Sequence, residues 1–386
     1  MFDMSTSRLL QTTIMAVAMT FAEIPMVAAE SVLQFEVDPR WPQTLPNNWA
    51  IGQIAGLAVD ARDHVWVIHR PGSLSERETK AARTPPAAPC CIPAPPVIEF
   101  DQTGRVVRAW GGPGEGYDWP SNEHGITVDP KGNVWILGNG NGPLGPSGAP
   151  DRSASDGMAL KFTADGKFLL QIGGRGPAKS SRDTTRLNKA AKIVFDTDGN
   201  EAYIADGYVN HRVIVFDANT GAYKRMWGAY GKLPTDEPRS RDLQHSLQQF
   251  DVVHCVVRAD DGSVYVCDRQ HHRIQVFDSA GRFQSEFSYA QDHLDGAIPG
   301  RVADLAIWPD RDQSMLIIAD GNFEMIRIVH RRDGSPVVNI GRQGDYAGQF
   351  NRLHVLTVDS RGNIYTGEAG AKRVQKFALT GGTPPR

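Results

Sequence analysis

The stretch VHCVVRADDGSVYVCDRQHHRIQVFD, residues 253–278, contains the pattern that decides the fold of this chain. Two short apolar runs flank the turn ADDG, and a third run ends in Phe277. Alternation of inward and outward residues is typical of strands with one buried face, and a short turn with Asp and Gly is typical of a β-hairpin. Residues 253–278 are therefore predicted to form a small antiparallel sheet.

The same unit recurs along the chain, and its copies align on one large residue in the second predicted strand. The aligned residues lie about 50 to 70 positions apart, a spacing typical of propeller blades, and they are Trp66, Trp135, Tyr203, Tyr265, Leu316 and Tyr365. One such sheet exposes an apolar face, whereas six sheets packed around an axis cover one another. We therefore predict an all-β fold, a six-bladed β-propeller of NHL type over residues 48–380.

The segments outside the repeat have other expected roles. Residues 1–29 resemble a secretory signal peptide, because Arg8 precedes the apolar run LLQTTIMAVAMTFA and small residues precede Glu30. The alternative is an uncleaved membrane anchor. Residues 30–47 are expected to lead into the propeller. Residues 72–96 and 140–157 are rich in Pro and Gly and are expected to be non-helical loops inserted into the first two blades.

The composition excludes some classes of protein. The net charge is −3, with 40% hydrophobic and 22% charged residues, so nothing indicates a nucleic-acid partner or an anionic membrane surface. The 39 glycines and 25 prolines favour many short strands and tight turns. Parallel α/β folds are disfavoured because no amphipathic helix of crossover length separates the strands.

Four cysteines suit the oxidising compartment that a signal peptide predicts. Cys255 and Cys267 are equidistant from Asp261 in the turn, so they are expected to face each other across two strands. Cys90 and Cys91 are adjacent in the first insert. We expect a disulfide within each pair; the alternative is free thiols. The mature protein is therefore expected to be exported, either periplasmic or secreted.

Three histidines occupy one column of the repeat. His124, His254 and His354 each lie eleven residues before the aligned residue, in the second, fourth and sixth copies. Alternate blades of a closed six-bladed ring are related by a three-fold axis, so the three imidazoles are predicted to converge there. Three histidines with an open fourth position are typical of catalytic zinc; the alternative is three separate histidines bound to channel water. Four histidines outside the column are expected to be surface residues or neighbours of the site: His69, His211, His271 and His272.

Other candidate site residues follow the aligned position. Arg70 and Arg269 follow it by four residues and are expected to bind a substrate carboxylate. Tyr208 follows it by five, and a phenol beside a metal cation can act as a base. The alternatives are salt bridges at the rim and a tyrosine that covers the blade end. Because the first insert starts just after Arg70, we also expect Cys90 and Cys91 to form one wall of the substrate pocket.

Several of these stretches together resemble peptidyl-α-hydroxyglycine α-amidating lyase and its NHL-type relatives. They are IGQIAGLAVD with VIHR, EHGITVDPKGNVW, IADGYVNHRV, VHCVV with VCDRQHHRIQVF, and FNRLHVLTVDSRGNIY. The resemblance implies a six-bladed propeller with a central zinc. It assigns zinc ligands to His124, His254 and His354, the catalytic tyrosine to Tyr208, and the two site arginines to Arg70 and Arg269. The family has an aspartate after its third histidine that helps to bind calcium, whereas here Val355 follows His354, so calcium is not expected.

The leading hypothesis is a zinc-dependent lyase that cleaves a carbinolamide or related α-hydroxy compound into an amide and an aldehyde such as glyoxylate. Zinc would act as a Lewis acid on the substrate hydroxyl. The expected partner is a small-molecule or peptide-derived substrate with a carboxylate. One alternative is a zinc-dependent hydratase or hydrolase of another small substrate. Another is a non-catalytic NHL propeller that binds peptide or protein. The oligomeric state is not predicted.

Overall fold

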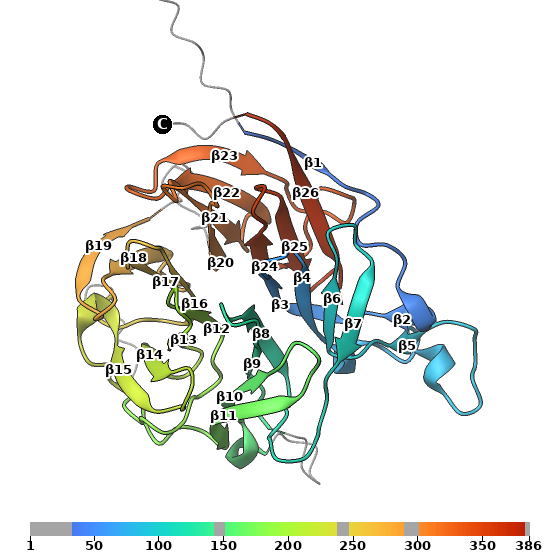
Figure 1. Cartoon of the computed structure of the whole chain (residues 1–386), viewed down its shortest axis with the longest axis horizontal. Coiled ribbons are helices and arrows are strands. Elements are labelled where there is room, and N and C mark those ends of the chain that lie inside the picture. Colours follow the sequence, from blue (N-terminus) through green and yellow to red (C-terminus); the bar gives the residue numbers. More distant parts are fainter. Residues whose placement is uncertain (1–32, 143–150, 238–246, 289–300, 383–386) are drawn as a thin grey trace, which may run out of the picture. The chain divides into compact units, whose positions relative to one another are not determined.

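The computed structural model describes residues 33–142, 151–237, 247–288 and 301–382. Within these ranges six four-stranded antiparallel sheets are arranged as the blades of a ring (Figure 1). The prediction of an all-β, six-bladed propeller is confirmed. No helix among the described residues is long and apolar enough to cross a membrane. The expected signal peptide, residues 1–29, lies outside the described ranges.

Five of the sheets use four strands in chain order, from the axis outward. The first contains β3 (Gln53–Val59), β4 (Val65–Arg70), β6 (Val97–Phe100) and β7 (Val106–Trp110). The second contains β8 (Glu123–Val128), β9 (Val134–Gly138), β10 (Asp156–Phe162) and β11 (Phe168–Arg175). The third contains β12 (Lys192–Phe195), β13 (Glu201–Asp206), β14 (Arg212–Asp217) and β15 (Tyr223–Trp227). The fourth contains β16 (Val253–Arg258), β17 (Val264–Asp268), β18 (Arg273–Phe277) and β19 (Phe283–Phe287). The fifth contains β20 (Val302–Ile307), β21 (Met315–Asp320), β22 (Met325–His330) and β23 (Pro336–Ile340).

The sixth sheet joins the two ends of the described chain. It contains β24 (Leu353–Val358), β25 (Ile364–Glu368) and β26 (Val374–Gly381), with β1 (Gln34–Val37) as its outermost strand. β1 lies within the stretch 30–47 that was expected only to lead into the propeller; it pairs with β26 from Gln34 opposite Gly381 to Val37 opposite Phe377. The innermost strands contact one another in a closed cycle, β3, β8, β12, β16, β20, β24 and back to β3. The ring is therefore closed by β1 on the outside and by β24 against β3 on the inside.

Hydrophobic side chains fill the spaces between neighbouring sheets. The described residues form six apolar clusters, each between two adjacent sheets. Trp66 of the first sheet and Ile136 of the second share one cluster, and Val65 and Tyr365 share the cluster between the first and sixth sheets. Both faces of each sheet are thereby buried, which explains why the aligned column of the repeat contains large residues.

Each repeat begins with a hairpin turn that a carboxylate organises. In the second sheet Asp129 Oδ1 accepts the backbone N–H of Lys131 at 3.0 Å and of Asn133 at 2.9 Å. Asp129 Oδ2 accepts the indole N–H of the buried Trp135 at 3.0 Å. The equivalent pairs are Asp60 with Trp66 and Asp359 with Tyr365. In these three sheets an aspartate six residues before the aligned aromatic therefore accepts hydrogen bonds from the backbone of the turn and from the one polar atom of that aromatic side chain.

The inserts contain short 3-10 turns, although their composition predicted no helix. The turns within or beside them are η2 (Pro71–Ser73), η3 (Lys80–Ala82) and η4 (Arg152–Ala154), and the described residues also form η1 (Pro46–Asn48) and η5 (Ala229–Gly231) elsewhere. In the first insert β5 (Ile92–Pro93) pairs in parallel with β2 (Trp49–Ala50), to the outer side of the first sheet (Figure 1). The end of the second insert belongs to β10, which starts at Asp156.

Closure by β1 predicts that the propeller needs this strand for full stability. A chain that starts at Asp38 lacks the backbone hydrogen bonds to β26 and the packing of Phe35 and Val37 against the cluster of the fifth and sixth sheets. We expect a loss of about 2 to 3 kcal/mol in the free energy of unfolding, the scale of burying two such side chains, relative to a chain that starts at Gln34. Thermal and urea unfolding of the two chains measure the difference. Equal stabilities would show that β1 is dispensable.

Candidate metal centre and substrate pocket

The three histidines of the repeat column meet at the centre of the ring. His124, His254 and His354 are each the second residue of an innermost strand, β8, β16 and β24. Their ring centroids lie 5.1 to 5.4 Å apart. One nitrogen from each ring lies within 4.8 Å of the other two. The predicted convergence on a three-fold axis is what the structure shows.

The three odd-numbered sheets orient these imidazoles. Each Nδ1 lies within hydrogen-bond distance of a main-chain carbonyl of the next sheet: His124 with Ala191 O at 2.9 Å, His254 with Ala303 O at 2.5 Å, and His354 with Ile54 O at 3.0 Å. A carbonyl oxygen only accepts, so each Nδ1 must carry the proton. Each Nε2 is therefore left with a lone pair that points toward the other two histidines, the arrangement in which imidazole binds a metal.

The environment keeps the imidazoles unprotonated. Burial lowers the pKa of His124 and of His254 well below the usual value of 6.5, and neighbouring imidazoles and guanidiniums lower the pKa of both further. Burial, followed by the charge of Arg70, lowers the pKa of His354 to about 3. The neutral imidazole is the form that ligates a metal, so the site favours the ligand form at neutral pH.

Tyr208 lies against this cluster, and its single hydroxyl proton leaves the hydrogen bonding of the histidines incomplete. The Tyr208 hydroxyl oxygen is 3.1 Å from His124 Nε2 and 2.8 Å from His254 Nε2. Both nitrogens accept, and the hydroxyl has one proton, so it can satisfy only one of them. A cation bound by the three Nε2 atoms would satisfy all the lone pairs at once. The donor set of three neutral imidazoles fits zinc with an open fourth position.

The two arginines found by sequence lie beside the cluster. Arg70 Nε donates to the carbonyl of Glu123 at 2.9 Å, and Arg70 Nη1 donates to Gln53 Oε1 at 3.2 Å. The Arg269 guanidinium carbon lies 5.3 Å from the centre of the Tyr208 ring, within the range of a cation–π contact. Arg269 Nε is buried without a hydrogen-bond partner. Both side chains keep free donors for an anion.

A cavity of about 250 Å³ lies over the histidines and is lined by Tyr208 and His354 among others. All six sheets contribute to it at or just after the end of the second strand, with Arg70, Asn139, Tyr208, Arg269, Gly321 and Ala369. The residues that precede the innermost strands contribute Asn122, Arg301 and Arg352. Sequence reasoning found Arg70, Tyr208 and Arg269 but missed the second set. Asn122 and Arg352 could have been found, because each lies two residues before a column histidine.

Four buried ion pairs hold the segments that carry these residues. Each joins an acidic residue at the end of a second strand to an arginine of the next hairpin: Asp206–Arg212 at 2.8 Å, Asp268–Arg273 at 2.9 Å, Asp320–Arg327 at 2.8 Å and Glu368–Arg373 at 2.6 Å. Each carboxylate also accepts a backbone N–H from the segment that leads to the innermost strand, from Asn188, Asp251, Arg301 and Asn351. Sequence reasoning missed them, although the acid and arginine lie only five to seven residues apart.

A second cavity of about 10 Å³ lies further along the innermost strands, between His124 and His254. Val355 and Asp304 line it. The Lys192 ammonium is 2.6 Å from Asp304 Oδ1, so the one carboxylate that lines this cavity among the described residues already has a cation. These side chains give no support to a calcium site there.

The cysteine pairs have different positions. Cys255 and Cys267 lie opposite each other in β16 and β17 and are joined in a disulfide with their Cα atoms 5.1 Å apart. Cys90 and Cys91 are also joined, but they lie in the first insert and line neither the cavity with the arginines nor the one beside Arg70 and Trp119. We expected these two cysteines to form a wall of the substrate pocket, and this placement does not agree with that expectation. The insert runs along the outer side of the first sheet (Figure 1).

The histidines outside the column do not join the cluster. His69 is fully buried rather than on the surface; its Nδ1 accepts the backbone N–H of Gly52 at 3.1 Å, and its Nε2 lies 3.0 Å from the carbonyl of Pro95. His211 Nδ1 lies 2.7 Å from the carbonyl of Phe250, and His271 Nδ1 lies 2.8 Å from Asp268 Oδ2. His272 follows in the same turn and has a positive φ.

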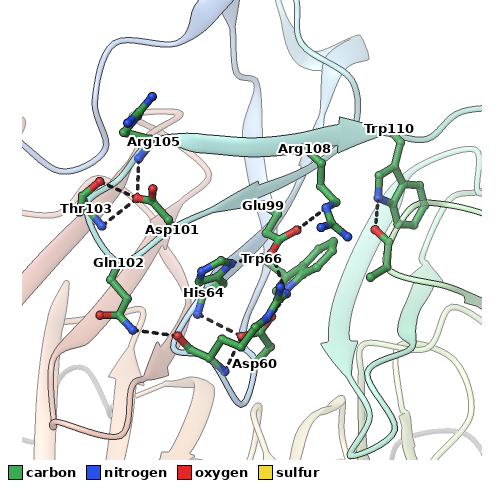
Figure 2. Close-up of polar contacts among 12 residues, drawn as sticks. Asp60, His64, Trp66, Glu99, Asp101, Gln102, Thr103, Arg105, Arg108 and Trp110 are labelled. Atoms are coloured by element: carbon green, nitrogen blue, oxygen red, sulfur yellow. Dashed lines mark hydrogen bonds and ion pairs between the residues drawn. The ribbon is translucent and has the colours of Figure 1, made fainter.

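A further group of potential ligands, Asp60, His64 and Glu99, lies at the turn between β3 and β4 (Figure 2). Glu99 Oε1 is 2.7 Å from His64 Nδ1 and 2.8 Å from Arg62 Nη2, while Glu99 Oε2 is 2.8 Å from Arg108 Nε. Arg62 also pairs with Asp60 at 2.6 Å. Two guanidiniums already neutralise these carboxylates, so the group is an ion-pair network and not a second metal centre.

The geometry of the histidine cluster predicts a metal stoichiometry of about one zinc per chain. His124→Ala, His254→Ala and His354→Ala should each lower the zinc content well below that value. The propeller should stay folded, because packing between the sheets supplies its core. Metal analysis with circular dichroism measures both properties. His330→Ala, a change in β22 outside the cluster, is the control. Full zinc occupancy in all three cluster variants would overturn the assignment.

Burial of His69 predicts a pH-dependent loss of stability. Burial lowers its pKa from 6.5 to about 4, so the unfolded chain takes up this proton first as the pH falls. The contribution of the neutral His69 side chain to the free energy of unfolding is complete above pH 6.5. It is lost between about pH 6.5 and pH 4 and amounts to about 3 kcal/mol. In His69→Gln the free energy of unfolding, measured in urea, should fall less over this range than in the wild type. Identical pH profiles would contradict the prediction.

Comparison with known proteins agrees with this architecture. A family model described as NHL repeat matches residues 250–277. The chain is 22% identical over 365 residues to "Peptidyl-glycine alpha-amidating monooxygenase B" of Xenopus laevis, across 90% of this chain and 36% of that protein. It is 24% identical to "Probable peptidyl-alpha-hydroxyglycine alpha-amidating lyase pgal-1" of Caenorhabditis elegans, across 91% of this chain and 89% of that protein. It is 25% identical to "NHL repeat-containing protein 3" of Homo sapiens, across 73% and 72%.

Among solved structures, "Streptogramin B lyase structure" superposes with a TM-score of 0.51 and 14% sequence identity, across 90% of this chain and 98% of that one. This likeness supports the fold alone. The chain spans about one third of the length of the two Xenopus laevis relatives that it matches. The resemblance drawn from the motifs is confirmed: the chain is a six-bladed β-propeller, its residues 250–277 match an NHL repeat, and it is similar over most of its length to peptidyl-α-hydroxyglycine α-amidating lyases.

Proposed function

We propose that this protein is a zinc-dependent lyase that cleaves a carbinolamide, R–CO–NH–CH(OH)–COO⁻, into the amide R–CO–NH₂ and glyoxylate. The observation that carries the proposal is the set of three inward-facing Nε2 lone pairs beside the Tyr208 hydroxyl, in a cavity with free guanidiniums. A platform that only binds peptide needs neither converging imidazoles nor a phenol at hydrogen-bond distance from two of them.

Each residue of the site has a role in this reaction. When bound, zinc would supply a Lewis acid that polarises the substrate hydroxyl. Tyr208 accepts the hydroxyl proton as the general base, and the Arg269 guanidinium carbon lies 5.3 Å from the centre of its ring. The carbon–oxygen double bond forms as the carbon–nitrogen bond breaks. The bond electrons and one proton then pass to the nitrogen, which leaves as the amide.

The arginines fix the substrate while this happens. Arg70 and Arg269 flank the cavity and keep donors free, and either Arg70 or Arg269 can hold the planar carboxylate, which a guanidinium binds through two parallel hydrogen bonds. Holding the carboxylate places the carbinol carbon over the histidines, and such positioning is itself a large part of catalysis.

Two kinds of support come from outside the geometry. Relatives from Xenopus laevis and Caenorhabditis elegans are named as an alpha-amidating monooxygenase and a probable alpha-amidating lyase. The motifs that carry the resemblance contain the cluster histidines. The two disulfides suit an oxidising compartment. We infer that the protein is exported and acts in the periplasm or outside the cell.

Release of glyoxylate tests the reaction directly. The zinc-loaded protein is incubated with an N-acyl-α-hydroxyglycine, and glyoxylate and amide are quantified in equal amounts. Chelation of zinc should abolish turnover, and addition of zinc should restore it. Hydrolysis of the amide bond to a carboxylic acid, without release of the amide, would instead favour a zinc-dependent hydrolase on the same site.

Tyr208→Phe separates proton transfer from binding. The change removes only the hydroxyl, so we expect kcat to fall by about 10²-fold or more, the scale of a lost general base, with little change in KM. Tyr346→Phe, at a side chain that is 80% exposed, is the matched control. Steady-state kinetics on the cleaved substrate measure both constants. Unchanged kcat in Tyr208→Phe would assign the tyrosine to packing alone.

A further inference from the structure

The cavity over the histidines contains more positive charge than one carboxylate needs. Arg70 and Arg269, at the ends of second strands, are joined there by Arg301 and Arg352, which precede the innermost strands β20 and β24. Four guanidiniums thus line a space of about 250 Å³. A cavity of this volume holds a small molecule or the end of a longer one.

These four arginines differ from the other arginines near the axis in lacking acidic partners. Arg212, Arg273, Arg327 and Arg373 each form an ion pair with the acid at the end of their own sheet's second strand. Within the described part of the chain, no ion pair joins a carboxylate to Arg70, Arg269, Arg301 or Arg352. Guanidiniums without a protein carboxylate at this density are typical of an anion-binding site.

The nearest acidic groups bind other partners. Glu324 accepts the backbone N–H groups of Arg352 at 3.1 Å and of Leu353 at 2.7 Å, and burial raises its pKa. Glu123 Oε1 accepts the indole N–H of Trp119 at 2.9 Å. Asp251 contributes a nearby negative charge to Arg269. These carboxylates therefore leave much of the positive charge in the cavity for a ligand.

The four arginines form two couples on different sides of the axis. Arg70 ends β4 of the first sheet, and Arg352 precedes β24 of the sixth sheet, which contacts β3 of the first. In the same way Arg269 follows β17 of the fourth sheet, and Arg301 precedes β20 of the fifth sheet, which contacts β17. The couples lie at the junctions of sheets six and one and of sheets four and five.

Resting on the proposed lyase function, we propose that the substrate is a dianion that carries a second carboxylate on its acyl group. Arg269, which lies against Tyr208, takes the carboxylate next to the carbinol carbon, and the couple of Arg70 and Arg352 takes the second one. Arg352, exposed at the mouth of the cavity, is then a specificity residue that selects diacid over monoacid substrates.

The test compares two substrates that differ only in the second charge: N-glutaryl-α-hydroxyglycine and N-pentanoyl-α-hydroxyglycine. A charge-assisted contact is stronger than a neutral one, so kcat/KM for the glutaryl compound should exceed that for the pentanoyl compound by about tenfold or more. Arg352→Gln should lower the value for the glutaryl compound about tenfold more than the value for the pentanoyl compound. Arg332→Gln, at an exposed arginine paired with Asp333, should change neither ratio.

A binding measurement keeps this inference separate from the lyase assignment. Calorimetry on the zinc-loaded protein compares glutarate with butyrate. Tighter binding of glutarate that is lost in Arg352→Gln supports the dianion site even if neither acyl compound is cleaved, an outcome that would overturn only the lyase. Cleavage of both compounds at equal rates, or equal binding of glutarate and butyrate, would overturn the dianion site and leave the lyase intact.

Discussion

Each four-stranded sheet in this protein has two apolar faces, and the need to bury both is the constraint on which the rest of the structure depends. Stacking sheets in a row would leave two faces in water, whereas a closed ring leaves none. The six clusters between sheets and the pairing of β1 with β26 both serve this closure. Closure in turn brings the six innermost strands together and fixes their order around the axis.

The ring converts a spacing along the chain into a site in space. Because every innermost strand starts at the same height, a histidine at its second position in every other sheet places three imidazoles at one point. The sheets between them provide carbonyl oxygens that fix each ring as the Nδ1–H tautomer. Even-numbered sheets thus provide the three histidines of the candidate metal centre and odd-numbered sheets orient them, so the site needs the complete ring.

Charge is distributed unevenly around this axis. Arginines that hold the hairpins are paired with buried carboxylates and serve stability, as in Asp206–Arg212. Arginines that face the cavity are without such pairs and are supported by main-chain and amide groups, as Arg70 is by Glu123 O and Gln53. Placing guanidiniums without carboxylate partners in a partly buried space costs stability, and the anion site that we propose gives a physical reason for retaining them.

The sequence by itself determined the repeat, the strands and the residues that converge, because a period of two within strands and a fixed offset between copies are local properties. His124, Tyr208 and Arg269 could be named from their offsets alone. The tertiary structure decided which residues from outside the repeat pattern share that space. Arg301 and Arg352 reach the cavity, whereas Cys90 and Cys91, expected there, do not line it. Loops leave the repeat at equivalent points but follow paths set by long-range contacts, such as β5 with β2 and Lys372 with Glu78, and no local pattern encodes those contacts.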